Sequence, residues 1–200
     1  PPDKLKCLRR TTTMANKDAP FGLKPIGKVG QNRDAQGLSE YSIAASATAI
    51  YFQDPVEILA TGTIGVAAAS DALLGSLNGV FFTDASSSKP TYANHLNASN
   101  TATDIVGFVS DDPYERFEIQ ADGATAAADV GLNADIVYAA GSSPDYVSQV
   151  ELQTSDQKTG TAQLRIIGIS KDPDNNTAGS ANVNLVTIIN EHQLKGTTGI

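Results

Sequence analysis

Short apolar runs separated by turn-forming residues dominate the chain from residue 40 onward. In about half of these runs apolar and polar residues alternate, which is the pattern of a strand with one buried and one exposed face. Turn signals such as Asp54-Pro55 and Asp111-Asp112-Pro113 recur roughly every 8–12 residues. The runs lie at 41–44, 49–52, 56–59, 79–83, 104–109, 116–120, 136–138, 150–152, 162–169 and 182–189. We therefore expect an all-β fold, a small β-barrel or β-sandwich.

The composition agrees with a folded β protein. Hydrophobic residues make up 40% and charged residues 18% of the 200 residues, which is near globular usage. Aromatic residues are scarce at 6% and Trp is absent, so the core must rely on Ile, Val, Leu and small side chains. Residues 84–103 are polar and rich in turn formers, and we expect a long surface loop there. Gly62 and Gly65 are expected to interrupt the chain around Ile64 and Val66.

The N-terminal region differs from the rest in its density of breakers. Pro and Gly recur between residues 20 and 37, and neither a helical nor an alternating pattern survives among them. We expect an extended N-terminal arm over residues 1–37, not a folded element, followed by a β-rich body over 38–200. Residues 1–13 precede Met14 and read as a possible leader. The apolar residues Phe21, Leu23 and Ile26 are the arm's candidate anchors.

The charge of the chain is divided unevenly. Residues 1–33 carry eight Lys and Arg against two Asp, while residues 34–200 carry six against 20 acidic residues, giving +6 and −14. The acidic body predicts no binding to nucleic acid, because phosphate binding needs a positive surface. The basic arm needs a partner surface. The apolar runs are much shorter than the ~20 residues that span a bilayer, so we expect no membrane contact.

Motifs for catalysis or cofactor binding do not stand out. We find no nucleophile elbow, P-loop, dinucleotide fingerprint or His-Glu-x-x-His pair. Cys7 is the single cysteine, which excludes an internal disulfide and a cysteine-cluster metal site. His95 and His192 are more consistent with surface or hydrogen-bonding roles than with a triad or zinc site. We predict a protein that is not an enzyme and that needs no cofactor or metal.

Two carboxylate clusters have both a functional and a structural interpretation. Asp172-x-Asp174-x-Asn176 has the alternating oxygen spacing of a calcium loop, but it lacks the following Gly and the distal Glu, so a β-turn is favoured. Asp111-Asp112 with Glu115 could be a functional carboxylate group, and a solvated hairpin tip is the favoured interpretation.

Several blocks of the sequence, in order, resemble a family of tailed-bacteriophage virion proteins described as structural or capsid decoration (cement) proteins. The resemblance runs from Met14 to Gln193 and has no catalytic motif. Gln53 stands where members of the family have Gly, so the turn there is expected to differ. The blocks are 14–25 (MANKDAPFGLKP), 49–56 (AIYFQDPV), 105–108 (IVGF), 117–120 (FEIQ), 129–134 (DVGLNA), 163–168 (QLRIIG), 173–175 (PDN) and 189–193 (INEHQ).

The resemblance implies a β-rich protein on the outside of the phage head, assembled in the host cytoplasm and present as a homo-oligomer, often a trimer. Its partner is then the major capsid protein, which the arm would clamp by running over a neighbour or adding a strand to a sheet edge. Alternatives are another virion component (tail, adaptor or shell protein) and a host-surface or glycan-binding module. The arm residues expected to touch the capsid are Phe21, Leu23, Lys24, Pro25, Ile26, Lys28 and Arg33.

Overall fold

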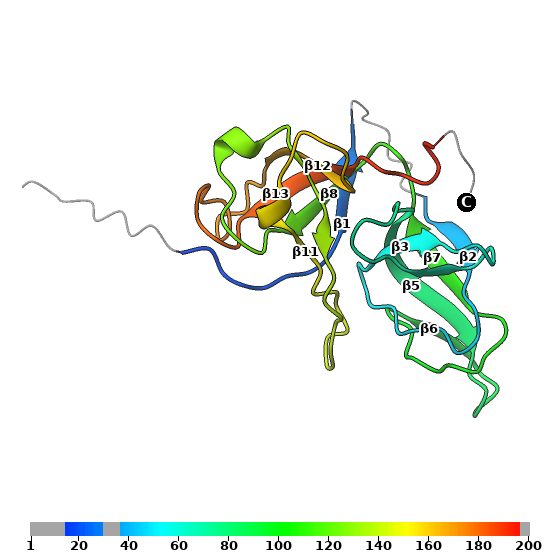
Figure 1. The fold of residues 1–200 in the computed structure, drawn as a ribbon. Coiled ribbons are helices and arrows are strands. Elements are labelled where there is room, and N and C mark those ends of the chain that lie inside the picture. Colours follow the sequence, from blue (N-terminus) through cyan, green and yellow to red (C-terminus); the bar gives the residue numbers. More distant parts are fainter. Residues whose placement is uncertain (1–14, 30–36, 197–200) are drawn as a thin grey trace, which may run out of the picture.

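The computed structural model describes residues 15–29 and 37–196, and it consists of two antiparallel β-sheets in a sandwich-like arrangement (Figure 1). The described residues form no α-helix, and their helical structure is limited to two 3₁₀ turns, Ala127–Asp129 and Thr154–Asp156. The all-β prediction is confirmed. Each sheet packs on a separate group of buried apolar side chains.

The five-stranded sheet, here sheet A, is built from the beginning and the second half of the chain. Its core includes Phe117, Ile119, Leu164 and Leu185, all fully buried. A separate two-stranded ribbon of β10 (Ile136–Val137) and β11 (Glu151–Leu152) adds Ile136 and Leu152 to the same core. The strand order is β1 (Lys24–Lys28), β8 (Glu115–Gln120), β13 (Asn184–Ile189), β12 (Leu164–Ile169) and β9 (Asn133–Ala134).

The six-stranded sheet, here sheet B, is built from one continuous part of the chain. Its core contains Ile43, Val56, Leu77 and Val109. Gly107 faces this core, where an added Cβ would lie 2.9–3.3 Å from the terminal methyl groups of Ile43, Ile64 and Leu77. The strand order is β2 (Ser39–Ser42), β7 (Val106–Ser110), β5 (Gly75–Thr83), β3 (Pro55–Ile58) and β4 (Ile64–Val66), with β6 (Pro90–Ala93) paired to β5.

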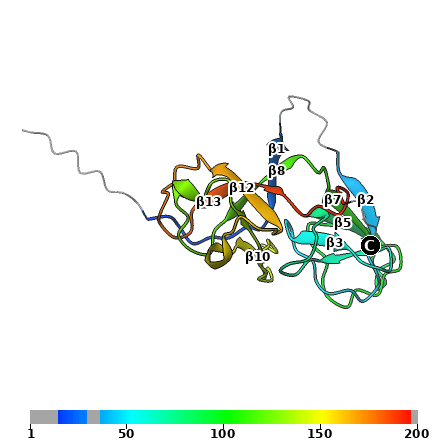
Figure 2. The same cartoon turned by 45° about the horizontal axis from the view of Figure 1, so that its top comes forward.

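Sheet B is inserted into sheet A. All its strands fall between β1 and β8, which are neighbours in sheet A. The residues after β13 then cross back to sheet B, where the backbone of Leu73 pairs with His192 (Figure 2). Ala67 and Leu73, which come from the sheet B region, belong to the core of sheet A. The two sheets are therefore joined by several crossings.

Most predicted strands are present, but four elements differ from expectation. The predicted strand 49–52 is reduced to isolated bridges at Ile50 and Phe52. The predicted loop 84–103 contains β6, which pairs with β5 and begins at Pro90, an acceptable residue at the start of an edge strand. The segment around Gly65 is strand β4. The prediction that residues 14–37 hold no folded element is wrong for β1. Its Pro25 and Gly27 are tolerated because β1 is an edge strand with a bulge between them.

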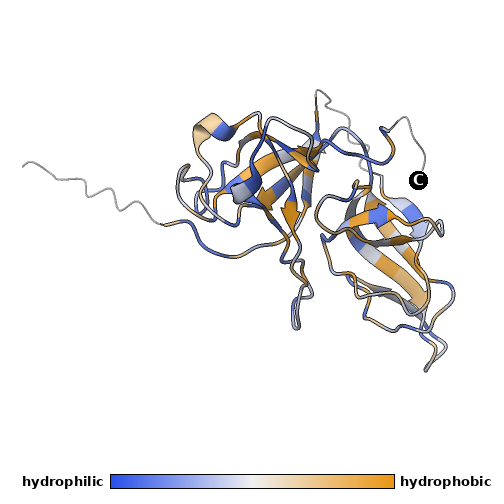
Figure 3. Ribbon diagram, in the orientation of Figure 1, coloured by the Kyte–Doolittle hydropathy of each residue, from blue (hydrophilic) through white to orange (hydrophobic). Residues whose placement is uncertain are grey.

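The interior strand β8 also departs from its predicted alternation. Hydrophobic residues alternate with polar ones along the strands of both sheets (Figure 3), yet the polar residues Glu118 and Gln120 of β8 are buried as well. Glu118 is covered by Lys24 and Ser170, and Gln120 is covered by residues 17–19. The N-terminal residues thus serve as the cover of a sheet face that the sequence pattern assigned to solvent.

Candidate functional site

The first part of the predicted arm is bound to its own body through side-chain amides. Asn16 donates from Nδ2 to the carbonyl of Ala181 at 2.9 Å. Asn175 accepts from the backbone N of Lys17 at 2.9 Å and donates back to its carbonyl at 2.7 Å. Gln120 accepts from the N of Ala19 at 2.8 Å. These reciprocal bonds replace a β-ladder, and they fix an extended segment that has no strand partner.

The next residues of the arm pass between the two sheets. Leu23 is fully buried in the core of sheet A. Its N donates to the carbonyl of Gln53 at 2.9 Å, and its carbonyl accepts from Ser76 Oγ at 2.5 Å. Gly22 has a φ of +76°, and a Cβ there would lie 2.3 Å from the Gln53 carbonyl oxygen. Leu23 is therefore a core residue and is not available for the predicted capsid contact.

Of the remaining predicted contact residues, Lys24, Pro25, Ile26 and Lys28 lie on β1. Phe21 precedes this strand, and Arg33 falls outside the described residues. Lys24 pairs with Glu118 at 3.1 Å and lies 5.7 Å from the centre of the half-buried Phe21 ring. Lys28 pairs with Asp112 at 2.5 Å. Pro25 is half-buried, whereas Ile26 is the extra residue of the bulge and is 43% exposed. Lysine, proline and a bulge discourage an edge strand from pairing with a further strand. A partner would therefore contact β1 through its side chains and not through its backbone.

The predicted carboxylate cluster 111–115 is not a solvated hairpin tip. It connects β7 of sheet B to β8 of sheet A, two strands that do not pair with each other. Asp111 accepts hydrogen bonds from Ser39 Oγ at 2.9 Å and from the Tyr41 hydroxyl at 2.7 Å. Glu115 is 2% exposed. The cluster therefore anchors the point where the chain passes from one sheet to the other.

At this connector, Lys28 and Asp112 each stabilise the charged form of the other. The side chain of Lys28 holds the pKa of Asp112 below its usual value, and Asp112 in turn raises the pKa of Lys28. Burial raises the pKa of Tyr41, with a further contribution from its bond to Asp111. Burial also raises the pKa of Glu115, and the Glu115 Oε1 atom has no hydrogen-bond partner among the described residues.

The C-terminal segment 190–196 straps the two sheets together beside this connector. The carbonyl of Glu191 accepts from the N of Leu73 at 2.9 Å. Gln193 makes two bonds to the backbone of Ile58, as acceptor at 2.7 Å and as donor at 3.1 Å. His192 is buried, and its Nδ1 accepts from the N of Leu194 at 3.1 Å. Burial and then Lys195 lower the pKa of His192, which favours the neutral ring that this bond requires.

Four large apolar side chains are exposed around these crossings, and we call them the junction surface. They are Ile26, Val29, Tyr114 and Leu194, with exposed fractions of 43%, 42%, 60% and 51%. The N of Val29 donates to the carbonyl of Tyr114 at 2.9 Å, and Lys195 Nζ lies 4.6 Å from the centre of the Tyr114 ring. Sequence reasoning singled out Ile26 alone, because Tyr114 follows a turn and nothing in its local pattern distinguishes an exposed ring from a buried one.

The other candidate residues have structural roles. Asp172 Oδ1 accepts from the N of Asp174 at 3.1 Å, which closes the predicted turn. His95 stacks on Tyr146 with ring centres 3.8 Å apart. In residues 15–29 and 37–196, no group of three or more His, Cys, Asp or Glu side chains is placed to hold a metal ion. No helix in the same part of the chain is long and apolar enough to cross a membrane.

A cavity of about 500 Å³ lies beside β4. Its lining is mainly small and apolar, with Ala47, Val66 and Ala67 among its walls and Tyr138 at the side of sheet A. Burial raises the pKa of Tyr138 to about 12, so its hydroxyl stays protonated at neutral pH. Tyr138 carries the one ionisable side chain among the residues that line this cavity.

No protein-family model, curated protein or solved structure matches this chain. A functional interpretation of this chain therefore rests on the geometry of its own residues and on the resemblance in its sequence.

Proposed function

We propose that this protein is a structural component of a tailed-phage virion that decorates the outside of the head. In this role the junction surface is the face that rests on the major capsid protein. The observation that carries the proposal is the exposed set of Ile26, Val29, Tyr114 and Leu194 on a rigidly tied junction. An exposed apolar group of this kind, including an aromatic ring, is typical of a protein contact.

The construction of the junction suits a clamp on a shell. The strap, the connector and β1 are fixed by the ion pair of Lys28 and by the bonds of Asp111 and Gln193. A preformed surface loses little conformational entropy on binding. Each apolar side chain contributes ~1.5–3 kcal/mol when fully buried, so one copy would bind weakly. Many copies on one particle would still reinforce the shell through multivalency.

The charge distribution supports the same orientation. Residues 34–200 carry a net charge of −14, and a strongly charged outer surface keeps a densely covered particle soluble. The alternatives remain another virion component or a host-surface module. For the latter, exposed tyrosine rings such as Tyr92 would be the sugar-stacking groups.

A binding assay on purified heads that lack the protein tests this proposal. We expect Ile26→Asp combined with Tyr114→Asp to weaken head binding by about tenfold or more, because both substitutions place a charge in the contact. Val130→Asp is the matched control, since Val130 is 41% exposed but lies beside the 3₁₀ turn at 127–129.

Equal binding of the junction variant and the wild type would contradict the proposed contact. Binding of the wild type to isolated tails or to glycans, but not to heads, would instead favour one of the alternatives. The three proteins should first be shown to unfold at the same temperature, so that a loss of binding reports on the surface.

A further inference from the structure

The outer face of sheet B carries a row of aromatic side chains at its solvent side. Tyr92 on β6 is directly opposite Phe81 on β5, with ring centres 4.8 Å apart. Phe108 on β7 stacks on Tyr92 at 6.4 Å with an interplanar angle of 15°. Tyr92 is 75% exposed, the largest exposure among the large apolar side chains of the described residues. We call these three residues the aromatic face.

The backbone register explains why three rings meet on one face. Phe108 pairs with Gly79 of β5, which has no side chain to separate the Phe108 ring from Tyr92. On its other side Phe108 pairs with Glu40 of β2, which is exposed. The chain has only six Phe and six Tyr, and three of these rings meet at this surface. Because aromatic residues are enriched in protein interfaces, this group of rings is a candidate binding surface.

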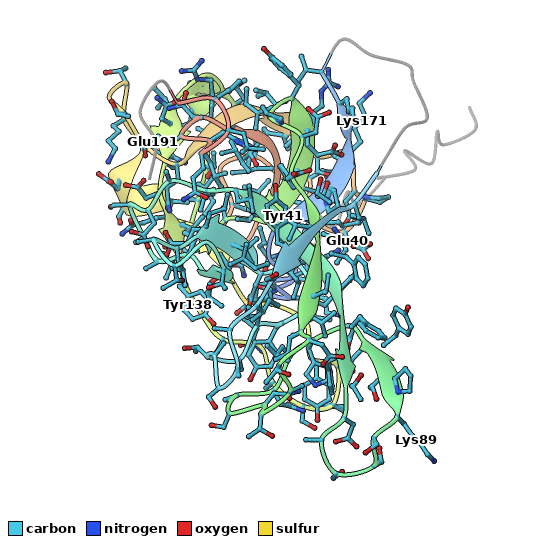
Figure 4. All side chains as sticks on the ribbon, turned by 90° about the vertical axis from the view of Figure 1, so that its right-hand side faces the viewer. Glu40, Tyr41, Lys89, Tyr138, Lys171 and Glu191 are labelled. Atoms are coloured by element: carbon cyan, nitrogen blue, oxygen red, sulfur yellow. The ribbon has the colours of Figure 1, made fainter. Side chains whose placement is uncertain are left out.

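The aromatic face lies in a part of the chain that contains only one basic residue. Residues 37–110 contain six Asp and Glu and one basic residue, Lys89. Figure 4 shows Lys89 at the lower tip of sheet B, well away from Glu40. Asp104 accepts from the N and Oγ of Thr83 at 3.0 and 2.6 Å, two residues along β5 from Phe81. These bonds lower the pKa of Asp104 and favour its charged form beside Thr83, two positions along the strand from Phe81.

Rings flanked by carboxylates favour a basic ligand. A Lys or Arg side chain can lie over an aromatic ring while its charge faces a nearby carboxylate. The same charge argues against two aromatic faces meeting each other, because two acidic surfaces repel. Within this chain, basic residues are concentrated at the N-terminus, where residues 1–13 hold Lys4, Lys6, Arg9 and Arg10 against one Asp.

We infer that the aromatic face of one copy binds the basic residues 1–13 of a neighbouring copy. A neighbour is favoured because the described chain begins, in dark blue, on the side of sheet A away from sheet B (Figure 1), and Asn16 is tied there to the carbonyls of Thr177 and Ala181. The contact joins two different surfaces, so it runs head to tail and closes into a ring when the rotation permits. This inference concerns contacts between copies and does not depend on the shell contact.

A mixing experiment with full-length variants tests the inference. One variant carries Lys4→Glu, Lys6→Glu, Arg9→Glu and Arg10→Glu with an intact aromatic face. The other carries Tyr92→Ser with an intact N-terminus. We expect the wild type to self-associate in sedimentation velocity runs at low salt, each variant alone to associate about tenfold more weakly or worse, and a mixture of the two to regain a 1:1 complex.

The control is Tyr114→Ser, which removes an exposed tyrosine from the junction surface and is expected to leave self-association unchanged. Association should also weaken as salt rises, because exposed charges are screened. A wild type that stays monomeric, a Tyr92→Ser variant that associates normally, or a mixture that does not regain the complex would each overturn the inference. Failure here, with normal head binding, would leave the proposed function intact.

Discussion

At the scale of single residues, Gly22 determines whether the N-terminal segment can pass between the sheets. Gly22→Ala would force a positive φ of about +76° on a residue with a Cβ and would place that Cβ 2.5 Å from Ser148 Cβ. We expect a loss of about 2–4 kcal/mol in the free energy of unfolding, measured by urea denaturation.

Gly62→Ala separates the strain in the backbone from the clash. Gly62 has a φ of +78°, but a Cβ there meets nothing within 4 Å. We expect Gly62→Ala to lower the free energy of unfolding by only about 1 kcal/mol. If Gly22→Ala and Gly62→Ala lower the free energy of unfolding equally, the close approach of Gln53 and Ser148 to Gly22 does not add to the cost of the substitution.

Asp54 provides a pH-dependent test of the same region. It is fully buried at the start of β3, and burial raises the pKa of its carboxyl from 3.8 to about 6, against the opposing effects of Ser148 and the Tyr51 amide. The folded state therefore holds the proton more tightly than the unfolded state. This contribution to stability is present below about pH 4 and is lost as the pH rises through 6.

We expect Asp54→Asn to remove that dependence while keeping an acceptor for the Tyr51 N. The difference in free energy of unfolding between the variant and the wild type should shift by about 2 kcal/mol in favour of the variant from pH 4.5 to pH 7.5. Urea unfolding at both pH values measures this shift. Asp174→Asn, at an exposed turn, should show the same difference from wild type at both pH values. A pH-independent effect of Asp54→Asn would mean that the carboxyl is not perturbed.

At the scale of elements, the sequence predicted the strands well and the arm poorly. The alternating runs at 116–120 and 162–169 form β8 and β12, because period-2 patterning reports a local property. The segment 15–29 has no such pattern, and its position depends on Asn175, Gln120 and Gln53, which are distant in sequence. The alternation within residues 116–120 gave no sign that the polar side chains of β8 would be covered by hydrogen-bonding groups from the N-terminal segment.

The same comparison explains the candidate surfaces. Ile26 was predicted as a contact residue because an apolar residue among breakers has no local core to join. Tyr114 and Leu194 were not predicted, since their exposure follows from where the connector and the strap cross. One consequence for experiments is that removal of residues 1–37 would delete Leu23 and strand β1, so surface substitutions are the better probe of binding.

At the scale of the whole molecule, the insertion of sheet B into sheet A gives the protein two separate outward-facing surfaces. The junction surface lies where the crossings meet, and the aromatic face lies on sheet B. The contrast between a basic N-terminus and an acidic remainder, visible in the sequence, is consistent with one surface for the shell and another for a neighbouring copy. The topology that separates these surfaces is non-local and could not be predicted from the sequence pattern.

The most direct test of the account is a cryo-electron microscopy reconstruction of the intact virion. The account predicts density for the two-sheet body on the outside of the head, in copies that follow the symmetry of the major capsid protein, with Ile26 and Tyr114 facing the shell. Density confined to the tail or portal, or a body bound to the head with the junction surface facing solvent, would contradict it.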